Sequence, residues 1–289
     1  STFTCMEATC GKQWDVLEAI KATKKTGPLA AYAVQGYCPA CDKQGLPYSG
    51  RFFDIPQPKA ADIAGLEWER QRDSDLAAFW PRSAIPVGAE IGEHDVNGHQ
   101  YTHWYTLFNS RQLLLLAQIL RSITSSHRFD WSACETVLGA FQQYLRSQNL
   151  FCIWDKGYDK LVPHLSSNTF HPKATVVENS VFPRLGRGNW ESCIEVMREG
   201  ISWSSTPWET LPVSELELMK SSLASEVSGK SVKVLCCDPI PNSSRLDSRS
   251  SSDLAECGSS DFDLVITDPP FSELVQYSEL ADFFYVWLR

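Results

Sequence analysis

Long hydrophobic runs are absent from this 289-residue sequence, which nowhere reaches the roughly 18 consecutive apolar residues of a membrane-crossing helix. The N-terminal residues STFTCMEATC also lack the basic start and apolar centre of a secretory signal peptide. These absences favour a cytoplasmic protein without membrane contact. Ten cysteines without a signal peptide point to a reducing compartment, where cysteine spacing indicates metal binding sooner than disulfides.

Basic side chains are in deficit, with 26 Lys and Arg against 35 Asp and Glu and a formal net charge of −9. That balance excludes a uniformly basic nucleic-acid coat or a polybasic membrane binder. The deficit is uneven, however. Residues 1–60 carry 7 basic and 5 acidic groups, and residues 101–190 carry 9 and 5, whereas 61–100 and 191–289 are acidic. A polyanion would therefore meet one of the two basic segments.

The apolar fraction of 43% and the charged fraction of 21% are those of an ordinary globular protein, which excludes wholesale disorder. The length suggests about two domains. The chain begins with Ser1 and ends in an apolar run, Phe283–Arg289. We therefore expect it to be a piece of a longer polypeptide, truncated at both ends.

Apolar periodicity predicts several helices. The strongest is SRQLLLLAQILRSIT, with Ser110 as N-cap, and the next has Ser132 as N-cap and Glu135 completing a capping box. Residues 174–182 favour a strand. Arg111 and Gln112, in the first turn of the strongest helix, are interpreted as solvent-facing, with DNA phosphate as the alternative. The predicted helices cover residues 60–80, 110–124, 132–147, 189–200 and 214–227.

Two short apolar runs, SVKVLCCD (231–238) and DFDLVITD (261–268), have the composition of buried parallel strands. Each ends on an aspartate, Asp238 and Asp268 respectively. Ligands of open α/β sheets bind at the carboxyl ends of the strands. The sequence therefore predicts an α/β fold with a ligand site at these two positions.

Four cysteines near the N-terminus form two pairs, Cys5 with Cys10 and Cys38 with Cys41. Each pair can supply two thiolates from one turn, and four thiolates complete a tetrahedral zinc site. The spacing predicts a zinc ribbon whose Zn²⁺ is structural. The alternative is four unrelated thiols, and the remaining cysteines are interpreted as apolar core.

The sharpest motif is Asp268-Pro269-Pro270-Phe271, directly after the second apolar run. Two prolines end the strand and force a turn. The Asp268 carboxylate and the Pro269 carbonyl could accept the two N–H bonds of a ring-conjugated amine and direct its lone pair at an electrophilic methyl group. Phe271 could stack on a base flipped from the duplex. An ordinary strand-to-loop turn is the alternative.

These residues resemble the adenine-specific DNA methylases that contain a zinc ribbon, and more widely the amino-methyltransferases with a (D/N/S)PP(Y/F) motif. The specific part is VITDPPF with VQYSELADFFYVWLR. Two departures stand out, because family members more often have Tyr at 271 and an Asp-Asn pair where Glu273 and Leu274 stand. Further similarity lies at 103–120 (HWYTLFNSRQLLLLAQIL), at TVVENSVF, at 186–190 (GRGNW) and at the cysteine pairs.

The resemblance implies S-adenosylmethionine as methyl donor and DNA as substrate, with adenine N6 favoured over cytosine N4. It implies part of a Rossmann-like methyltransferase sheet in 229–289, a zinc-ribbon-like region in 1–59 and a mainly helical target-recognition region in 60–228. Direct methyl transfer is expected, because the chain lacks the Pro-Cys dipeptide of cytosine-C5 enzymes. The fragment alone is expected to be inactive. Restriction–modification and other defence-system partners stay open.

Three weaker candidates concern the methyl donor. Asp238 could accept hydrogen bonds from its ribose or adenine, or could be a helix cap or loop acid. Gly186 and Gly188 could admit a phosphate or a cofactor backbone, or could belong to an ordinary loop. The family's glycine-rich donor loop would precede residue 1.

The rival functions are a methyltransferase acting on RNA or on a protein glutamine amide, and a non-catalytic zinc-ribbon DNA-binding subunit.

Overall fold

The chain folds into helices and small antiparallel sheets, grouped in two compact units. One unit contains Ser1–Met197 and Glu273–Arg289, and the other contains Arg198–Ser272. The computed structural model describes residues 2–88, 96–125, 130–155, 157–158, 160–166, 170, 172, 175–182, 185, 187–206, 208–212, 227–228, 231–235, 263–267 and 276–289.

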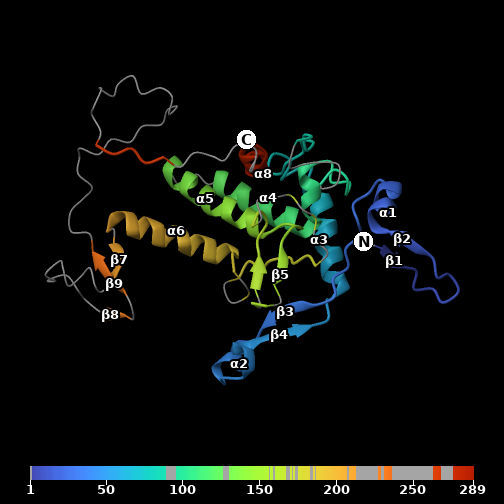
Figure 1. Ribbon diagram of the computed structural model, residues 1–289, viewed down its shortest axis with the longest axis horizontal. Helices are drawn as coiled ribbons and strands as arrows, with labels where there is room; N and C mark the ends of the chain where they lie inside the picture. Colours follow the sequence, from blue (N-terminus) through green and yellow to red (C-terminus); the bar gives the residue numbers. More distant parts are fainter. Residues whose placement is uncertain are drawn as a thin grey trace. The chain divides into compact units, whose positions relative to one another are not determined.

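Two antiparallel hairpins occupy the N-terminal part (Figure 1). In the first, β1 (Thr2–Thr4) pairs with β2 (Gln13–Asp15), and α1 (Val16–Thr23) follows at once. In the second, β3 (Val34–Tyr37) pairs with β4 (Arg51–Asp54). The connection between β3 and β4 contains α2 (Pro39–Lys43) and a 3-10 turn (Pro47–Gly50). Each predicted cysteine pair belongs to one of these hairpins.

Three helices form the body of the larger unit, with α4 in contact with both α3 and α5 (Figure 1). The buried residues of α4 recur every three or four positions, which places them on one face. The predicted helix over 110–124 is confirmed in full. The three are α3 (Pro58–Gln71), α4 (Ser110–Thr124) and α5 (Trp131–Ser147).

Both predicted N-caps are wrong. Asn109, not Ser110, caps α4, and it forms a capping box in which its side chain accepts from Gln112 N at 2.9 Å. Asp130, not Ser132, caps α5, and its carboxylate accepts from Ala133 N at 2.8 Å. The reason is local, since Asn and Asp are cap residues at least as good as Ser and each lies outside the first helical residue.

Two predicted helix ends also differ. The helix predicted over 60–80 ends at Gln71, after which the chain turns back so that Trp80 Nε1 donates to the Arg72 carbonyl at 2.9 Å. Helix α6 (Trp190–Ser205) continues past Gly200, because a single glycine weakens a helix without ending it. The helix predicted over 214–227 lies almost wholly outside the described residues.

The strand predicted over 174–182 is wrong in the part that the structure describes. Only Val176 pairs, through an isolated bridge to Ile153. Ile153 belongs to the small hairpin of β5 (Ile153–Asp155) and β6 (Lys160–Val162). The following residues instead use their polar side chains to bind α4 and α5, as described below.

The smaller unit contains a three-stranded sheet in the order β7 (Trp208–Pro212), β9 (Ser231–Leu235), β8 (Val227–Ser228). Its strand β9 confirms part of the run predicted over 231–238, but both its pairings are antiparallel. Residues 263–267 of the second run form no strand. The side chains of Leu264, Val265 and Ile266 are 73, 73 and 84% exposed. The predicted parallel pairing of two buried strands is therefore not found among the described residues.

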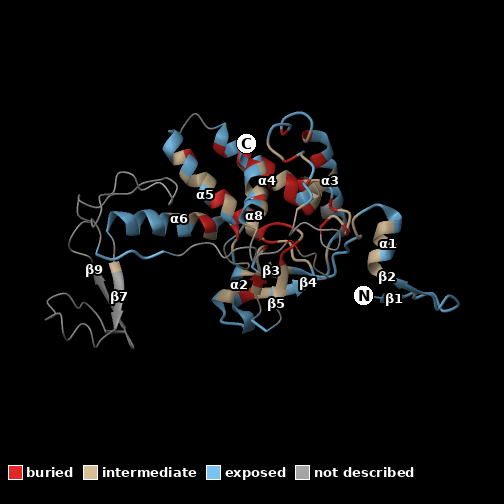
Figure 2. Ribbon diagram, turned by 45° about the horizontal axis from the view of Figure 1, so that its top comes forward, coloured by how far each residue is buried: buried red, intermediate tan, exposed pale blue. Residues whose placement is uncertain are grey.

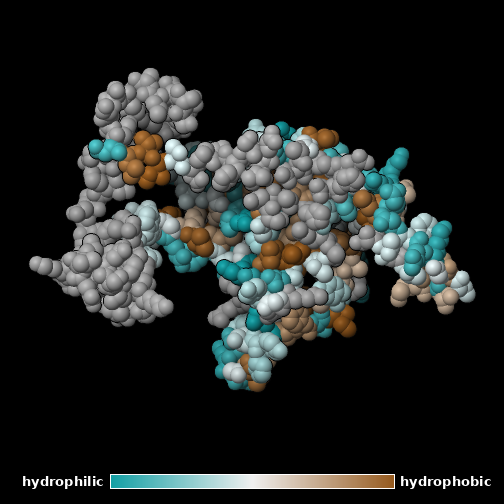
Figure 3. Space-filling model, in the orientation of Figure 1, coloured by the Kyte–Doolittle hydropathy of each residue, from teal (hydrophilic) through white to brown (hydrophobic). Residues whose placement is uncertain are grey.

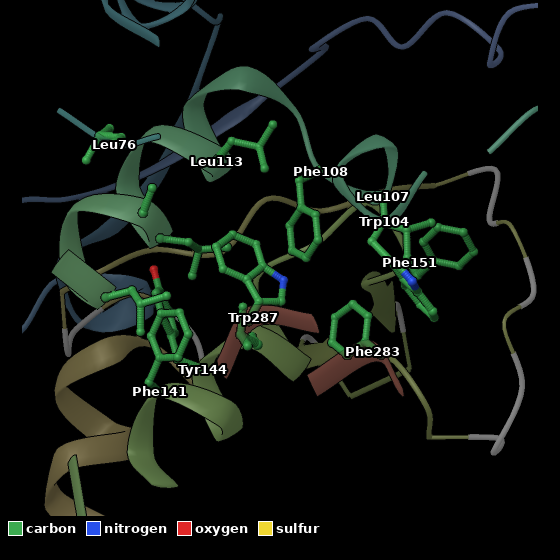
Figure 4. Packing of buried hydrophobic residues seen from close by; sticks show 14 of the residues in the cluster. Leu76, Trp104, Leu107, Phe108, Leu113, Phe141, Tyr144, Phe151, Phe283 and Trp287 are labelled. Carbon is green, nitrogen blue, oxygen red and sulfur yellow. The ribbon is translucent and has the colours of Figure 1, made fainter. Parts of the chain in front are cut away.

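An aromatic cluster forms the centre of the larger unit. Helix α8 (Tyr277–Leu288) inserts Phe283 and Trp287, which are 0 and 4% exposed, against the residues that precede α4 (Figure 4). Phe108 stacks on Phe283 with centroids 5.9 Å apart and meets Trp287 edge-on at 5.2 Å. Figure 2 shows buried positions on α3, α4, α5 and α8, whereas α1 has none and most of α6 is exposed.

Candidate functional site

The first cysteine pair lies in the loop of the β1–β2 hairpin. The backbone N–H of Cys5 donates to the Lys12 carbonyl at 2.9 Å, and that of Cys10 donates to the Glu7 carbonyl at 2.9 Å. Gly11 has φ +55°, a left-handed conformation that returns the chain to β2. Cys5 is half-buried and Cys10 is exposed. The loop therefore presents both cysteines from one turn.

The second pair is held more tightly, at the start of α2. Cys38 N donates to the Gly50 carbonyl at 2.8 Å, and Leu46 N donates to the Cys41 carbonyl at 3.1 Å. Gly50 has φ +75°, and a Cβ there would lie 2.5 Å from the Cys38 carbonyl oxygen. Only glycine fits this closure of the loop, so the turn that presents Cys38 and Cys41 is sterically fixed.

The two thiols of this turn differ in acidity. Hydrogen bonds from the Cys41 N–H, the Cys41 thiol and the Ala40 N–H lower the pKa of Cys38. The pKa of Cys41 is raised, mainly because its thiol donates to Cys38. Donated hydrogen bonds favour the thiolate, which is the form that binds zinc. These hydrogen bonds thus favour the thiolate at Cys38 and disfavour it at Cys41.

The structure does not bring the two pairs together. All four cysteines are described and free of disulfides, yet within the described ranges no three His, Cys, Asp or Glu side chains are grouped to hold a metal ion. The tetrahedral site of Cys5, Cys10, Cys38 and Cys41 stays a prediction. Three other cysteines, Cys134, Cys152 and Cys193, are buried as predicted, and burial raises the pKa of Cys152 and of Cys193 to about 11.

A polar cluster, which sequence reasoning missed, surrounds the N-terminus of α4. Arg111 binds Glu178 with two hydrogen bonds, Nε to Oε1 at 2.5 Å and Nη2 to Oε2 at 2.7 Å. Asn109 Nδ2 donates to the same Oε2 at 3.0 Å. The pairing with Glu178 raises the pKa of Arg111. Arg111 is exposed, as predicted, with its side chain 44% accessible, and its guanidinium also holds Glu178 of the 175–182 segment.

The inner half of this cluster is fully buried. Gln112 is 0% exposed, and its Nε2 donates to Gln148 Oε1 at 3.3 Å. Gln148 also holds the backbone of Asn179 from both sides, since its Oε1 accepts from Asn179 N at 2.9 Å and its Nε2 donates to Asn179 O at 2.8 Å. Gln112 is thus a buried structural group, and the solvent-facing interpretation is wrong for this residue.

Gly188 packs against a side chain. It has φ +65°, and a Cβ on it would clash with the hydroxyl of Ser147. The adjoining Arg187 carbonyl accepts from Asn179 Nδ2 at 3.0 Å. Glycine is therefore required at position 188 by a contact within the protein, with the side chain of Ser147. Binding of a cofactor at Gly188 stays a prediction, and Gly186 lies outside the described residues.

The motif Asp268 to Phe271, predicted to direct methyl transfer, and the candidate donor ligand Asp238 also lie outside the described residues. What the structure does describe is the chain on both sides of the motif. Residues 263–267 precede it, and α8 begins shortly after it at Tyr277. In the sequence, residues 272–276 separate the motif from this helix, whose Phe283 and Trp287 are buried.

A groove of about 300 Å³ lies between α4 and α5, closed at one side by Trp190. Leu115, Ile119 and Val137 give it an apolar lining. None of the residues predicted to bind donor, metal or substrate lines it. The groove therefore adds no chemistry to the predicted site.

Sequence reasoning could have found the polar cluster from one signal. Glu178 and Asn179 interrupt an otherwise apolar segment, and such residues in a buried position need partners. None of the helices in the described part of the chain has the length and apolar character that a bilayer crossing requires.

In comparisons with known proteins, no family model matches this chain, and no curated protein or solved structure matches it either.

Proposed function

We propose that the chain is part of an S-adenosylmethionine-dependent DNA amino-methyltransferase that methylates adenine N6, with cytosine N4 as the second choice. The observation that carries the proposal is the sequence Asp268-Pro269-Pro270-Phe271 after an apolar run. Its chemistry is specific, since it places two hydrogen-bond acceptors and an aromatic ring in four residues.

The exocyclic nitrogen of adenine is a poor nucleophile, because its lone pair is delocalised into the ring. Asp268 and the Pro269 carbonyl accept its two N–H bonds and so direct the lone pair away from the ring. Phe271 stacks on the flipped base and holds it in place. S-adenosylmethionine supplies an electrophilic methyl group, with Asp238, Gly186 and Gly188 as the proposed contacts of this chain.

Transfer is direct. The nitrogen forms a bond to the methyl carbon as the sulfur–methyl bond breaks, and the bonding pair remains on sulfur. The nitrogen then carries a positive charge, which the Asp268 carboxylate stabilises until one N–H proton is lost. No covalent bond to the protein forms, so no thiol nucleophile is required.

The packing of the larger unit supports the proposal. Segments that carry the methylase resemblance lie far apart in sequence but are in contact in the fold. Phe108 packs on Phe283 and Trp287, and Arg111 binds Glu178. One compact unit therefore contains these segments of the resemblance, whereas residues 265–271 belong to the other unit. The positive balance of residues 101–190 further suits a polyanionic substrate.

A methyl-transfer assay tests the proposal, with the full-length protein, labelled S-adenosylmethionine and duplex DNA. Asp268→Ala removes an acceptor of the reacting amine, and we expect the turnover rate to fall by at least about 100-fold. Asp263→Ala is the matched control, because Asp263 is an exposed aspartate of the same stretch. Its transfer rate should equal that of the wild type.

Unchanged transfer by Asp268→Ala would contradict the mechanism. Methyl transfer to RNA or to a protein glutamine amide, with none to DNA, would show that the substrate is RNA or protein and not DNA. DNA binding by a full-length protein that binds no methyl donor would identify a non-catalytic DNA-binding subunit instead.

A further inference from the structure

The turn between β3 and β4 holds two thiols in contact with each other. Cys38 is the N-cap residue of α2, and Cys41 lies in its first turn. Neither is part of a disulfide. The Cys41 thiol donates a hydrogen bond to the Cys38 sulfur. Each sulfur therefore has the other as its neighbour in the reduced protein.

The backbone of the turn keeps the two cysteines at this separation. Asp42 N donates to the Cys38 carbonyl at 3.1 Å, which closes the turn that contains both thiols. Pro39 is the first helical residue, and its ring fixes φ at that position. The close approach of Gly50 to the Cys38 carbonyl restricts the turn from the other side. The contact between the sulfurs thus depends on a segment with little conformational freedom.

This spacing is typical of dithiols that undergo reversible oxidation. Two cysteines separated by two residues are the arrangement found in disulfide oxidoreductases. A disulfide requires Cα atoms roughly 4.4–6.8 Å apart, a separation that two residues of one turn satisfy. In a reducing compartment such a disulfide is transient and serves catalysis or redox sensing.

The other described cysteines are less suited to this chemistry. Cys38 and Cys41 are half-buried, and Figure 3 shows hydrophilic and hydrophobic residues mixed on the surface of their hairpin, at the bottom of the view. Cys5 and Cys10 are also accessible, but four residues separate them in a hairpin loop. Three further cysteines are buried, and buried structural thiols are inert. These are Cys134, Cys152 and Cys193.

We propose that Cys38 and Cys41 form a redox-active dithiol, which a low-molecular-weight disulfide such as oxidised glutathione converts reversibly to an intramolecular disulfide. The proposal goes beyond the proposed function and does not depend on methyl transfer. It gives this pair a role that needs no ligand from the β1–β2 hairpin.

The exchange takes place in two steps. One thiolate of the pair attacks a sulfur of oxidised glutathione, so that a mixed disulfide forms and one glutathione leaves as a thiolate. The second thiol of the pair loses its proton to water and attacks the protein sulfur of the mixed disulfide, which releases the second glutathione. The two protein thiols have then lost two electrons and two protons, and oxidised glutathione has gained them as two thiols.

Mass spectrometry of the full-length protein tests the proposal. The reduced protein is equilibrated in mixtures of reduced and oxidised glutathione and quenched with acid, and its remaining thiols are alkylated. The peptide that contains Cys38 and Cys41 should lose two hydrogen atoms as the share of oxidised glutathione rises, and an excess of reduced glutathione should restore them. Cys41→Ser should abolish this disulfide and raise the amount of glutathione bound to Cys38 by at least about 10-fold, because no neighbouring thiol then releases it.

Cys10→Ser is the matched control, because Cys10 is an exposed cysteine of the other pair. In this variant the disulfide between Cys38 and Cys41 should form at the same glutathione ratio as in the wild type. A disulfide that joins the two hairpins would overturn the proposal. So would glutathione that stays bound to Cys38 or Cys41 in the wild type without an intramolecular disulfide.

The zinc content of the same samples separates the dithiol from the predicted zinc ribbon. Formation of the disulfide in a wild type that contains no zinc, or that releases zinc as the disulfide forms, would support the proposal. One equivalent of bound zinc, together with resistance of Cys38 and Cys41 to oxidised glutathione, would overturn it and support the four-cysteine site. Neither result depends on methyl transfer, which Asp268→Ala tests separately.

Discussion

Single side chains connect distant parts of this chain. The carboxylate of Glu178 binds the start of α4 from outside, through Arg111 and Asn109. The neighbouring residue, Asn179, is held from inside by Gln148. Buried amides are costly when they lose a partner, because a desolvated polar group then has no compensation. Two adjacent polar residues thus fix one segment against two helices.

Two glycines of the same region should respond to alanine in opposite ways. Gly188→Ala places a Cβ at φ +65° and against Ser147, so we expect the free energy of unfolding to fall by about 1–3 kcal/mol. Gly200→Ala meets nothing within 4 Å and lies inside α6. It should raise that free energy by roughly 0.5–1 kcal/mol, because alanine loses less backbone entropy in a helix.

Urea unfolding of the two variants and the wild type measures both effects under one condition. A neutral or stabilising Gly188→Ala would mean that the loop before α6 can shift away from Ser147.

The start of α4 depends on its cap as well as on its apolar face. Asn109→Ala removes the side chain that accepts from Gln112 N and donates to Glu178, so the free energy of unfolding should fall by about 1–2 kcal/mol. Ser110→Ala is the matched control, since Ser110 is the first helical residue and not the cap. Its effect should stay within about 0.5 kcal/mol. Denaturant titration followed by circular dichroism compares the two, and a larger loss from Ser110→Ala would contradict the observed cap.

Helix α4 could be predicted from sequence because its leucines repeat every three or four residues, a signal that needs no tertiary information. Its cap could not, since Asn109 and Ser110 are both good cap residues and only the backbone geometry decides between them. The composition of residues 174–182 predicts a strand. Tertiary hydrogen bonds from Glu178 and Asn179 prevail over that preference.

The candidate site, like the fold, could be predicted from the sequence only in part. The turn at Cys38 and Cys41 follows from the local CPAC sequence, and the structure shows the loop closure at Gly50 that holds it. Grouping four cysteines depends on contacts between two hairpins, which spacing along the chain does not specify. The cluster of Arg111 and Glu178 could not be paired from sequence, because 67 positions separate its two members.

The larger unit joins the beginning and the end of the chain. Residues before Met197 and after Glu273 belong to it, and the residues between them form the smaller unit. The link is aromatic, since Phe283 and Trp287 of α8 pack on Phe108 and Phe141 (Figure 4). The contact between Phe108 and Trp287 closes a loop of more than 170 residues. Closing this loop costs chain entropy, which burial of the aromatic rings must offset.

Trp287 is therefore the residue on which this closure should depend most. Trp287→Ala leaves a cavity between Phe108 and Phe141, and the free energy of unfolding should fall by about 3–5 kcal/mol. Tyr285→Ala, on the same helix but 60% exposed, should cost less than about 0.5 kcal/mol. Urea titration measures both, and equal losses would show that α8 does not anchor through its aromatic face.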